Sequence, residues 1–207
     1  AMGKYFGTDG FRSAANVVLT VEHAFKVGRY LGWSFGQDHK ARVVIGKDTR
    51  RSSYMFEYAL AAGLTASGAD AYLLHVTTTP SVSYVVRTED FDCGIMISAS
   101  HNPFYDNGIK VINSAGHKME AEVEEKIEAY IDGKTEELPL ATKENIGSTV
   151  DYAAGRNRYI GHLISLATRY IKAMRVGLDC ANGSSSAIAQ SGFDALGAKP
   201  EVRKSEW

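Results

Sequence analysis

The stretch from Ile97 to Lys110 combines side chains that could carry out group transfer. Ser98 and Ser100 offer hydroxyl groups, and His101 can exchange a proton near neutral pH. Lys110 then adds a cation at the end of the stretch. A Ser-His pair by itself is more often part of a plain surface turn, because short motifs match by chance. The whole 14-residue string is much less expected by chance, so we predict a reactive loop around a serine hydroxyl.

Two further loops carry cations with glycines. Residues 6–12 read FGTDGFR, and Arg12 supplies a planar guanidinium that suits phosphate oxygens. Residues 46–53 read GKDTRRSS, with Lys47 and Arg50 before a predicted helix, and a helix N-terminus can bind an anion. Alone, the first loop is better explained by an N-terminal turn with a solvated arginine, and the second is explained equally well by a helix cap with solvated charges.

Taken together, these loops predict phosphoryl transfer. Such transfer relies on cations gathered around the reacting oxygen. The cations expected beside Ser100 are Arg12, Lys47, Arg50, Arg51 and Lys110. The Gly-x-Ser-x-Gly motif of acyl transfer does not occur, and neither does the Gly-x4-Gly-Lys-Ser/Thr motif of P-loop enzymes.

The elements that must position these loops alternate between strand and helix patterns. Strands are predicted at 42–46, 71–75, 93–97 and 109–112, and helices at 20–36, 52–67, 79 onward and 119–131. Thr20 and Ser52 are the expected N-caps, and Asn102-Pro103 and Asn107-Gly108 the expected turns. This order favours a three-layer α/β/α domain with a mixed, mostly parallel sheet, whose strand ends hold the ligand.

The domain organisation follows from a change in composition. Residues 1–140 form the predicted first domain, and the polar residues 141–155 a linker. Residues 156–207 are expected to begin a similar second domain, with a helix over 152–173 and a strand over 175–179.

Composition argues against several classes of partner. The net charge of −1 shows no basic excess, so we expect no nucleic-acid binding. No apolar run approaches the roughly 20 residues of a membrane helix, and the first residues resemble no signal peptide. Cys93 and Cys180 lack metal-ligand spacing and are predicted to be buried, reduced thiols, which fits a cytoplasmic protein.

The three motifs together resemble those of a known family. Residues 97–103 with 107–110, 7–12 and 46–50 resemble the three N-terminal motifs of the α-D-phosphohexomutases. The forms GTDG and ISASHNP resemble the bacterial branch that acts on hexosamine phosphates, and 178–183 resemble the start of the family's second domain. The resemblance covers residues 3 to about 198.

The resemblance implies a phosphoserine mechanism. Ser100 would carry a phosphoryl group, pass it to the hexosamine phosphate substrate and recover the other phosphate from a bisphosphate intermediate. Mg2+ would bridge the phosphate on Ser100 and aspartates that this chain lacks, and a sugar 1,6-bisphosphate would act as activator.

The resemblance also implies roles for the neighbouring residues. Lys110 and Arg12 would serve proton transfer and stabilise the transferring charge, and His101 and Asn102 would shape the phosphoserine site. Substrate or phosphate binding would involve Thr8, Asn102, Lys47 and Arg50. Ser13 stands where the family usually has glycine, and would be strained if its φ were positive.

Alternatives remain open at this stage. Family members are about twice as long and have a sugar-recognition loop that this chain lacks, so we expect no turnover from these 207 residues alone. The substrate could instead be a glucose or mannose phosphate. In a different class, the chain could be a non-catalytic dimerisation or regulatory module, and a homodimer is expected in either case.

Overall fold

The computed structural model describes residues 3–7 and 10–181. Its elements are β1 (Phe6–Gly7), β2 (Gly10–Ala14), α1 (Val21–Phe35), β3 (Arg42–Lys47), α2 (Arg51–Ala66), β4 (Asp70–Val76), α3 (Thr79–Thr88), β5 (Cys93–Ile97), β6 (Asp106–Asn113), α4 (Ala121–Ile131), the 3-10 turn η1 (Lys143–Asn145), β7 (Thr149–Asp151) and α5 (Ala153–Ala181). The chain divides into two compact units, residues 1–157 and 158–207.

The described strands of the first unit form one seven-stranded mixed sheet, in the order β1-β2-β6-β5-β3-β4-β7. Strands β5, β3, β4 and β7 are parallel neighbours, and β6, β2 and β1 extend the sheet by antiparallel pairing. Five strands therefore run in one direction and β1 and β6 in the other, as predicted for a mixed, mostly parallel sheet. The short strands β1, β2 and β7 were not predicted, because two to five residues show no alternating pattern.

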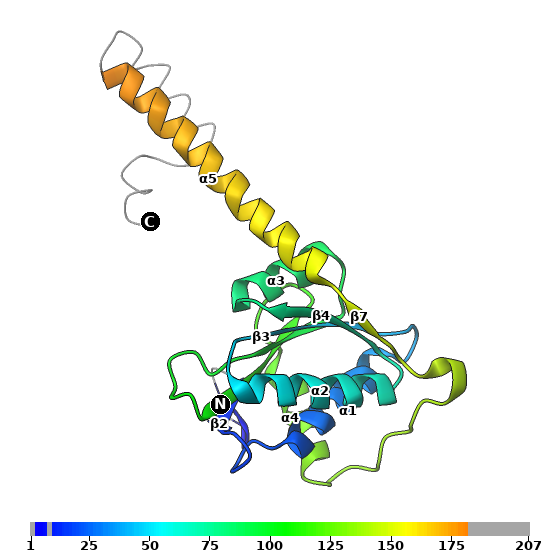
Figure 1. Ribbon diagram of the computed structural model, residues 1–207. Coiled ribbons are helices and arrows are strands. Elements are labelled where there is room, and N and C mark those ends of the chain that lie inside the picture. The colour runs from blue at the N-terminus through cyan, green and yellow to red at the C-terminus, as the bar shows by residue number, and fades with distance from the viewer. Residues whose placement is uncertain (1–2, 8–9, 182–207) are drawn as a thin grey trace. The chain divides into compact units, whose positions relative to one another are not determined.

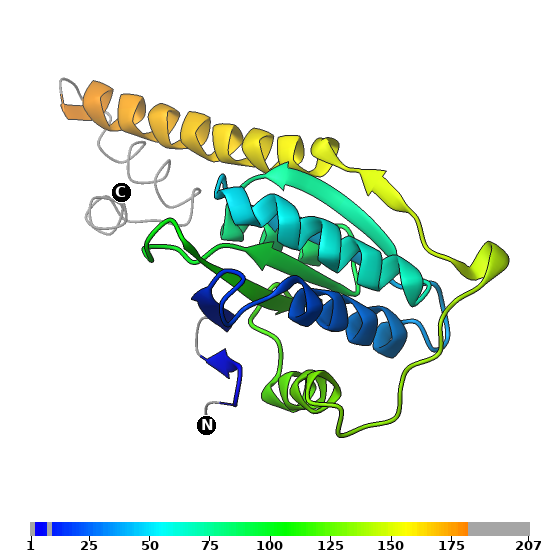
Figure 2. The same ribbon diagram turned by 60° about the horizontal axis from the view of Figure 1, so that its bottom comes forward.

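Helices cover both faces of this sheet, which confirms the three-layer architecture (Figure 1). Successive side chains of a strand point to opposite faces. On β3, Val43 and Ile45 therefore join the core under α1, α2 and α4, whereas Val44 joins a second core under α3. Figure 2 shows α1 and α2 lying side by side on the first face.

Close packing of α1 against α2 depends on two glycines that face each other. A Cβ on Gly28 would lie 2.5 Å from the carbonyl oxygen of Leu60, and one on Gly63 would lie 2.2 Å from that of Phe25. No Cβ can approach a carbonyl oxygen so closely, so the missing side chains set the distance between these helices.

Of the two predicted helix N-caps, one is confirmed and one is wrong. The Thr20 side chain accepts a hydrogen bond from the backbone N–H of His23, as expected of an N-cap. The prediction for Ser52 is wrong, because α2 begins at Arg51 with Arg50 as its N-cap. Ser52 instead accepts a hydrogen bond from Asn107, a residue 55 positions away.

The predicted linker contributes to the sheet. Within 141–155, η1 leads to β7, whose residue Val150 pairs with Tyr72 of β4. The N–H of Gly147 also donates to the carbonyl oxygen of Thr65. Backbone hydrogen bonds therefore attach this polar segment to the first unit, although its side chains show no strand pattern.

The described part of the second unit, residues 158–181, is helical. The prediction of a strand over 175–179 is therefore wrong, since α5 continues to Ala181. A strand needs a neighbouring strand for its backbone hydrogen bonds, whereas a helix satisfies them within itself. The remaining residues predicted for the second domain lie outside the described part. Over the described helices, no segment is long and apolar enough to cross a membrane.

Candidate functional site

The site lies where β3 and β5 end at the same edge of the sheet. Lys47, the last residue of β3, pairs with Ile97, the last residue of β5, in parallel register. The loops that follow these strands must therefore start side by side, and the N–H of Asp48 donates to the carbonyl oxygen of Ile97 at 3.0 Å. Parallel pairing thus brings the second and third predicted motifs together.

Ser100 lies exposed at the tip of the loop between β5 and β6. Its φ of 53° falls in the left-handed region, which is uncommon for a residue with a side chain. The Ser100 N–H donates to Ser98 Oγ at 3.0 Å, so the neighbouring serine supports the turn. Strained backbone of this kind often occurs at functional sites.

Lys110 brings a cation to this hydroxyl from the neighbouring strand. Antiparallel pairing aligns Lys110 with Met96, one residue before the end of β5. The Lys110 ammonium donates to Ser100 Oγ at 3.4 Å, a long hydrogen bond. Catalytic hydrogen bonds are often this long in the absence of substrate.

Arg12 reaches the same loop from β2. It pairs with Gly108 of β6, so the first motif lies beside the strand that follows the loop. Its guanidinium donates to Asn102 Oδ1 at 3.2 Å, and Asn102 Nδ2 donates to Asp106 at 3.0 Å. The first and third predicted motifs are therefore joined through Asn102.

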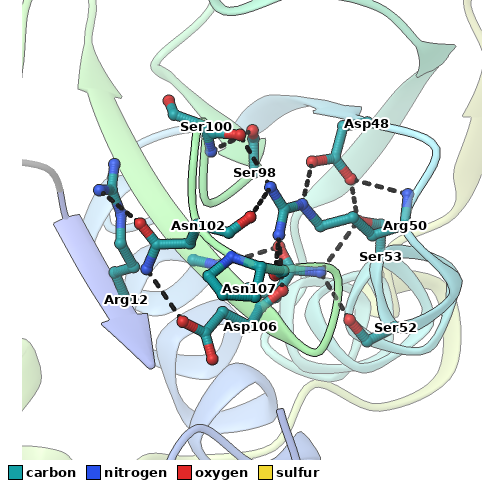
Figure 3. A network of polar contacts seen from close by, with 12 residues as sticks. Arg12, Asp48, Arg50, Ser52, Ser53, Ser98, Ser100, Asn102, Asp106 and Asn107 are labelled. Carbon is teal, nitrogen blue, oxygen red and sulfur yellow. Dashed lines mark hydrogen bonds and ion pairs between the residues drawn. The ribbon is translucent and has the colours of Figure 1, made fainter. Parts of the chain in front are cut away.

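Arg50 is directed at backbone oxygens of the Ser100 loop (Figure 3). Its terminal nitrogens donate to the carbonyl oxygens of four loop residues, which are Ser100 at 2.8 Å, Asn102 at 3.0 Å, Pro103 at 2.6 Å and Asp106 at 3.1 Å. Its Nε donates to Asp48 Oδ2 at 2.9 Å. Each of the five guanidinium N–H groups thus has an acceptor within the protein.

Asn107 was missed as a member of this network. It was predicted to be part of a turn, but it lies inside β6 and is fully buried. Its amide donates to Ser52 Oγ at 2.8 Å and to Ser53 Oγ at 2.9 Å, and its Oδ1 accepts from the N–H of Gly108 (Figure 3). A buried asparagine must find such partners, but no local pattern identifies residues more than 50 positions away as those partners.

Lys47 differs from the other predicted cations. Its ammonium lies 2.9 Å from Glu57 Oε2, and both side chains are only 4% exposed. It also lies 4.6 Å from the centroid of the Tyr54 ring. The structure therefore does not bring Lys47 into the network around Ser100.

The remaining predicted residues are placed as follows. His101 is exposed and follows Ser100 directly in the turn. Thr8 lies outside the described residues. Ser13 lies in β2, paired with Asn107, so the strain considered for a positive φ does not arise there.

The two cysteines differ in burial, and the prediction that Cys180 is buried is wrong, because its side chain on α5 is only partly buried. Cys93 is fully buried on β5, and burial raises the pKa of its thiol, which keeps it protonated and inert. Among residues 3–7 and 10–181, no group of three or more His, Cys, Asp or Glu side chains could hold a metal ion. The described residues therefore do not form a complete metal site.

The arrangement can orient and polarise an exposed serine hydroxyl. A guanidinium and an ammonium approach the loop from β2 and β6, and backbone and side-chain hydrogen bonds hold the loop itself. Positive charge near a hydroxyl stabilises the negative charge of a phosphoryl group that is transferred to or from it.

Comparisons with known proteins agree with this geometry. A family model described as phosphoglucomutase/phosphomannomutase, alpha/beta/alpha domain I, matches residues 3–138. The phosphoglucosamine mutase of Lachnoclostridium phytofermentans is 74% identical over 201 residues, which cover 97% of this chain and 45% of that protein. The phosphoglucosamine mutase of Lachnospira eligens is 72% identical over 204 residues, with the same coverage of 97% and 45%. The chain thus spans less than half the length of these relatives.

Solved structures show the same fold. A phosphoglucomutase/phosphomannomutase family protein from Burkholderia thailandensis superposes with a TM-score of 0.63 at 22% identity, over 80% of this chain and 36% of that one. A putative phosphomannomutase from Thermus thermophilus gives a TM-score of 0.57 at 29% identity, over 70% of this chain and 32% of that one.

Proposed function

The chain belongs to the phosphoglucomutase/phosphomannomutase family through its α/β/α domain I, and we propose that it is the phosphoserine-bearing part of a phosphoglucosamine mutase. The observation that carries the proposal is the hydrogen bond from the Lys110 ammonium to the exposed Ser100 hydroxyl. The identity of 74% to a relative with that name supports the choice of substrate, which is a hexosamine phosphate.

The proposed chemistry is reversible phosphoryl transfer at Ser100 Oγ. When Ser100 is first phosphorylated, its Oγ attacks a phosphorus atom of the sugar bisphosphate and its proton passes to the neutral amine form of Lys110. The bond between that phosphorus and the sugar oxygen breaks. That oxygen then takes up the proton. In the productive direction, the sugar hydroxyl attacks the phosphoserine, the Ser100 Oγ–P bond breaks, and the proton of the sugar hydroxyl is transferred to Ser100 Oγ. The resulting sugar bisphosphate reorients in the site and transfers its other phosphoryl group to Ser100.

Other residues orient and stabilise the transferring group in this proposal. Arg12, which lies on β2 and donates to Asn102, would stabilise negative charge on the phosphoryl oxygens. His101 and Asn102 would shape the space around the phosphate, and Thr8 would contribute to phosphate binding. We do not propose Lys47 as a phosphate ligand, because its charge is paired with Glu57.

Mg2+ is the metal that the family resemblance implies, and here it would neutralise charge on the phosphate. The described residues form no metal cluster, so within them only the phosphorylated Ser100 oxygen is proposed as a ligand. The carboxylate ligands that the resemblance implies would lie outside the described residues.

The test is intact mass before and after incubation with glucose 1,6-bisphosphate and Mg2+. A gain of one phosphate that maps to Ser100, and is absent in Ser100→Ala, would support the proposal. Phosphate on another residue, or an equal gain in Ser100→Ala, would contradict it.

The cell compartment and the oligomeric state are also proposals. We infer a cytoplasmic homodimer, because Cys93 is a free, buried thiol, which fits a reducing compartment, and because the family resemblance implies a dimer. We expect no mutase turnover from the 207-residue chain, since it spans 45% of its relatives. A phosphoglucomutase or phosphomannomutase activity would be distinguished by assaying a full-length relative with each sugar phosphate.

One observation favours a second function, that of an interaction module. Residues Ile164, Ile171 and Leu178 of α5 recur every seven positions, and they are 60%, 58% and 62% exposed. Such spacing is typical of helices that associate. Light scattering of the wild type and Ser100→Ala would test this function. Self-association that is independent of Ser100 but lost in Ile171→Glu would support a module built on α5. Self-association that survives Ile171→Glu would belong to the homodimer inferred above, and a monomer at all concentrations would exclude the module.

A further inference from the structure

We propose that Arg50 is a positioning residue that holds the Ser100 loop through its backbone and does not bind the phosphate itself. The sequence suggests a phosphate ligand instead, because the residue lies at a helix N-terminus beside the reactive loop. The proposal rests on the function proposed above for Ser100.

The hydrogen bonds of Arg50 already use its full donor capacity. Four N–H groups of the terminal nitrogens donate to carbonyl oxygens between Ser100 and Asp106, and the fifth N–H, on Nε, donates to Asp48. A guanidinium has five donors and no acceptor. A phosphate could gain a hydrogen bond from Arg50 only if one of the loop carbonyls lost its partner.

The guanidinium is itself fixed to the start of α2. Asp48 accepts from Nε at 2.9 Å and from the backbone N–H of Arg50 at 3.0 Å. Ser53 Oγ also donates to Asp48, and Asn107 donates to Ser53 in turn. The clamp therefore connects the ends of β3 and β5, two elements that the sheet already holds in register.

The bond to the Ser100 carbonyl bears directly on the reactive residue. Ser100 has a φ of 53°, a conformation that persists only where surrounding contacts hold it. Arg50 holds the peptide group immediately after Ser100, and the carbonyls of Asn102 and Pro103 two and three residues further on. The orientation of Oγ toward Lys110 thus depends on a side chain that never touches the reacting atoms.

A lysine cannot replace this clamp. Its ammonium is a compact charge with three donors, whereas the guanidinium is a rigid planar fork. Arg50→Lys keeps the positive charge but loses the planar set of five donors. The variant therefore separates the positioning of the loop by hydrogen bonds from electrostatic attraction by the charge alone. Arg51→Lys is the matched control. Arg51 was also expected beside Ser100, but its side chain is exposed at the start of α2 and makes no hydrogen bond to the described residues of the Ser100 loop.

The first measurement is hydrogen exchange of the loop in the absence of any sugar phosphate. The backbone N–H groups of Asn102 and Asp106 donate to the carbonyl oxygens of Ala99 and Pro103 within the loop. They should exchange faster than in wild type in Arg50→Lys and at the wild-type rate in Arg51→Lys. Asp48→Asn, which weakens the anchor, should show a smaller change in the same direction. Unchanged exchange in folded Arg50→Lys would overturn the clamp.

The second measurement is the rate of Ser100 phosphorylation against the concentration of glucose 1,6-bisphosphate. A positioning role predicts a maximal rate that falls by about 10- to 100-fold in Arg50→Lys, with a half-saturating concentration within about twofold of wild type. A raised half-saturating concentration with an unchanged maximal rate would make Arg50 a phosphate ligand and overturn the proposal. If wild type accepts no phosphate, the proposed function fails, and the exchange measurement still decides the clamp.

Discussion

The Lys47 ammonium lies 2.9 Å from the Glu57 carboxylate, between the end of β3 and the second turn of α2, and both side chains are buried. The pair joins a strand of the sheet to the helix that covers it. A lysine that the sequence places in a phosphate-binding motif therefore has a structural partner ten residues further along the chain.

Breaking this pair should destabilise the protein strongly. Lys47→Ala leaves the buried Glu57 without its partner, and we expect a loss of about 3 to 5 kcal/mol in the free energy of unfolding, measured by urea denaturation. The double variant Lys47→Met, Glu57→Leu replaces both charges with apolar groups and should recover most of that loss. A double variant as unstable as the single one would contradict this account.

Replacing Gly63 should separate α1 from α2. A Cβ there would lie 2.2 Å from the carbonyl oxygen of Phe25, so Gly63→Ala forces the helices apart at a cost of about 1 to 3 kcal/mol, measured by thermal or urea unfolding. Gly161→Ala is the control, since no atom lies within 4 Å of a Cβ at that position of α5. It should leave the unfolding of the first unit unchanged and raise helicity slightly. Equal effects of the two changes would argue against close helix packing.

Lys110 should control the rate at which Ser100 accepts phosphate. Lys110→Met removes the donor that lies 3.4 Å from Ser100 Oγ, and we expect phosphorylation by glucose 1,6-bisphosphate to slow by about 10²- to 10⁴-fold. Intact mass against time gives the rate. Lys126→Met, which removes an exposed lysine from α4, should react like wild type. An unchanged rate in Lys110→Met would remove Lys110 from the proposed chemistry.

His39 should make stability depend on pH. Its imidazole contacts Asp38 at 2.5 Å and Asp92 at 2.7 Å, and hydrogen bonds first to Asp38 and then to Asp92 raise the pKa of His39 above 6.5. Its contribution to stability is therefore fully present below pH 6.5 and is lost as pH rises through the raised value. His39→Gln should lower the urea midpoint at about pH 5.5 and change it little at about pH 8.5. A deficit that is the same at both pH values would contradict this coupling.

Much of the fold follows from local pattern. Short apolar runs identified β3, β4, β5 and the core of β6, and caps such as Thr20 identified where helices begin. The prediction failed where an element depends on its neighbours. Residues 149–151 form a strand because β4 offers an open edge, and residues 175–179 stay helical where the described chain offers them no strand to pair with.

The sequence by itself determined which residues could carry chemistry, because Ser100 and Lys110 belong to a 14-residue string that is not expected by chance, and Arg12 belongs to a second loop that combines a cation with glycines. Tertiary structure alone decided what two neighbouring cations do. Parallel pairing of β3 with β5 turns the Arg50 guanidinium toward the loop carbonyls, and the packing of α2 on the sheet turns Lys47 toward Glu57. The physical reason is that a charged side chain takes the acceptors that surround it in space, and those acceptors come from residues far away in the chain.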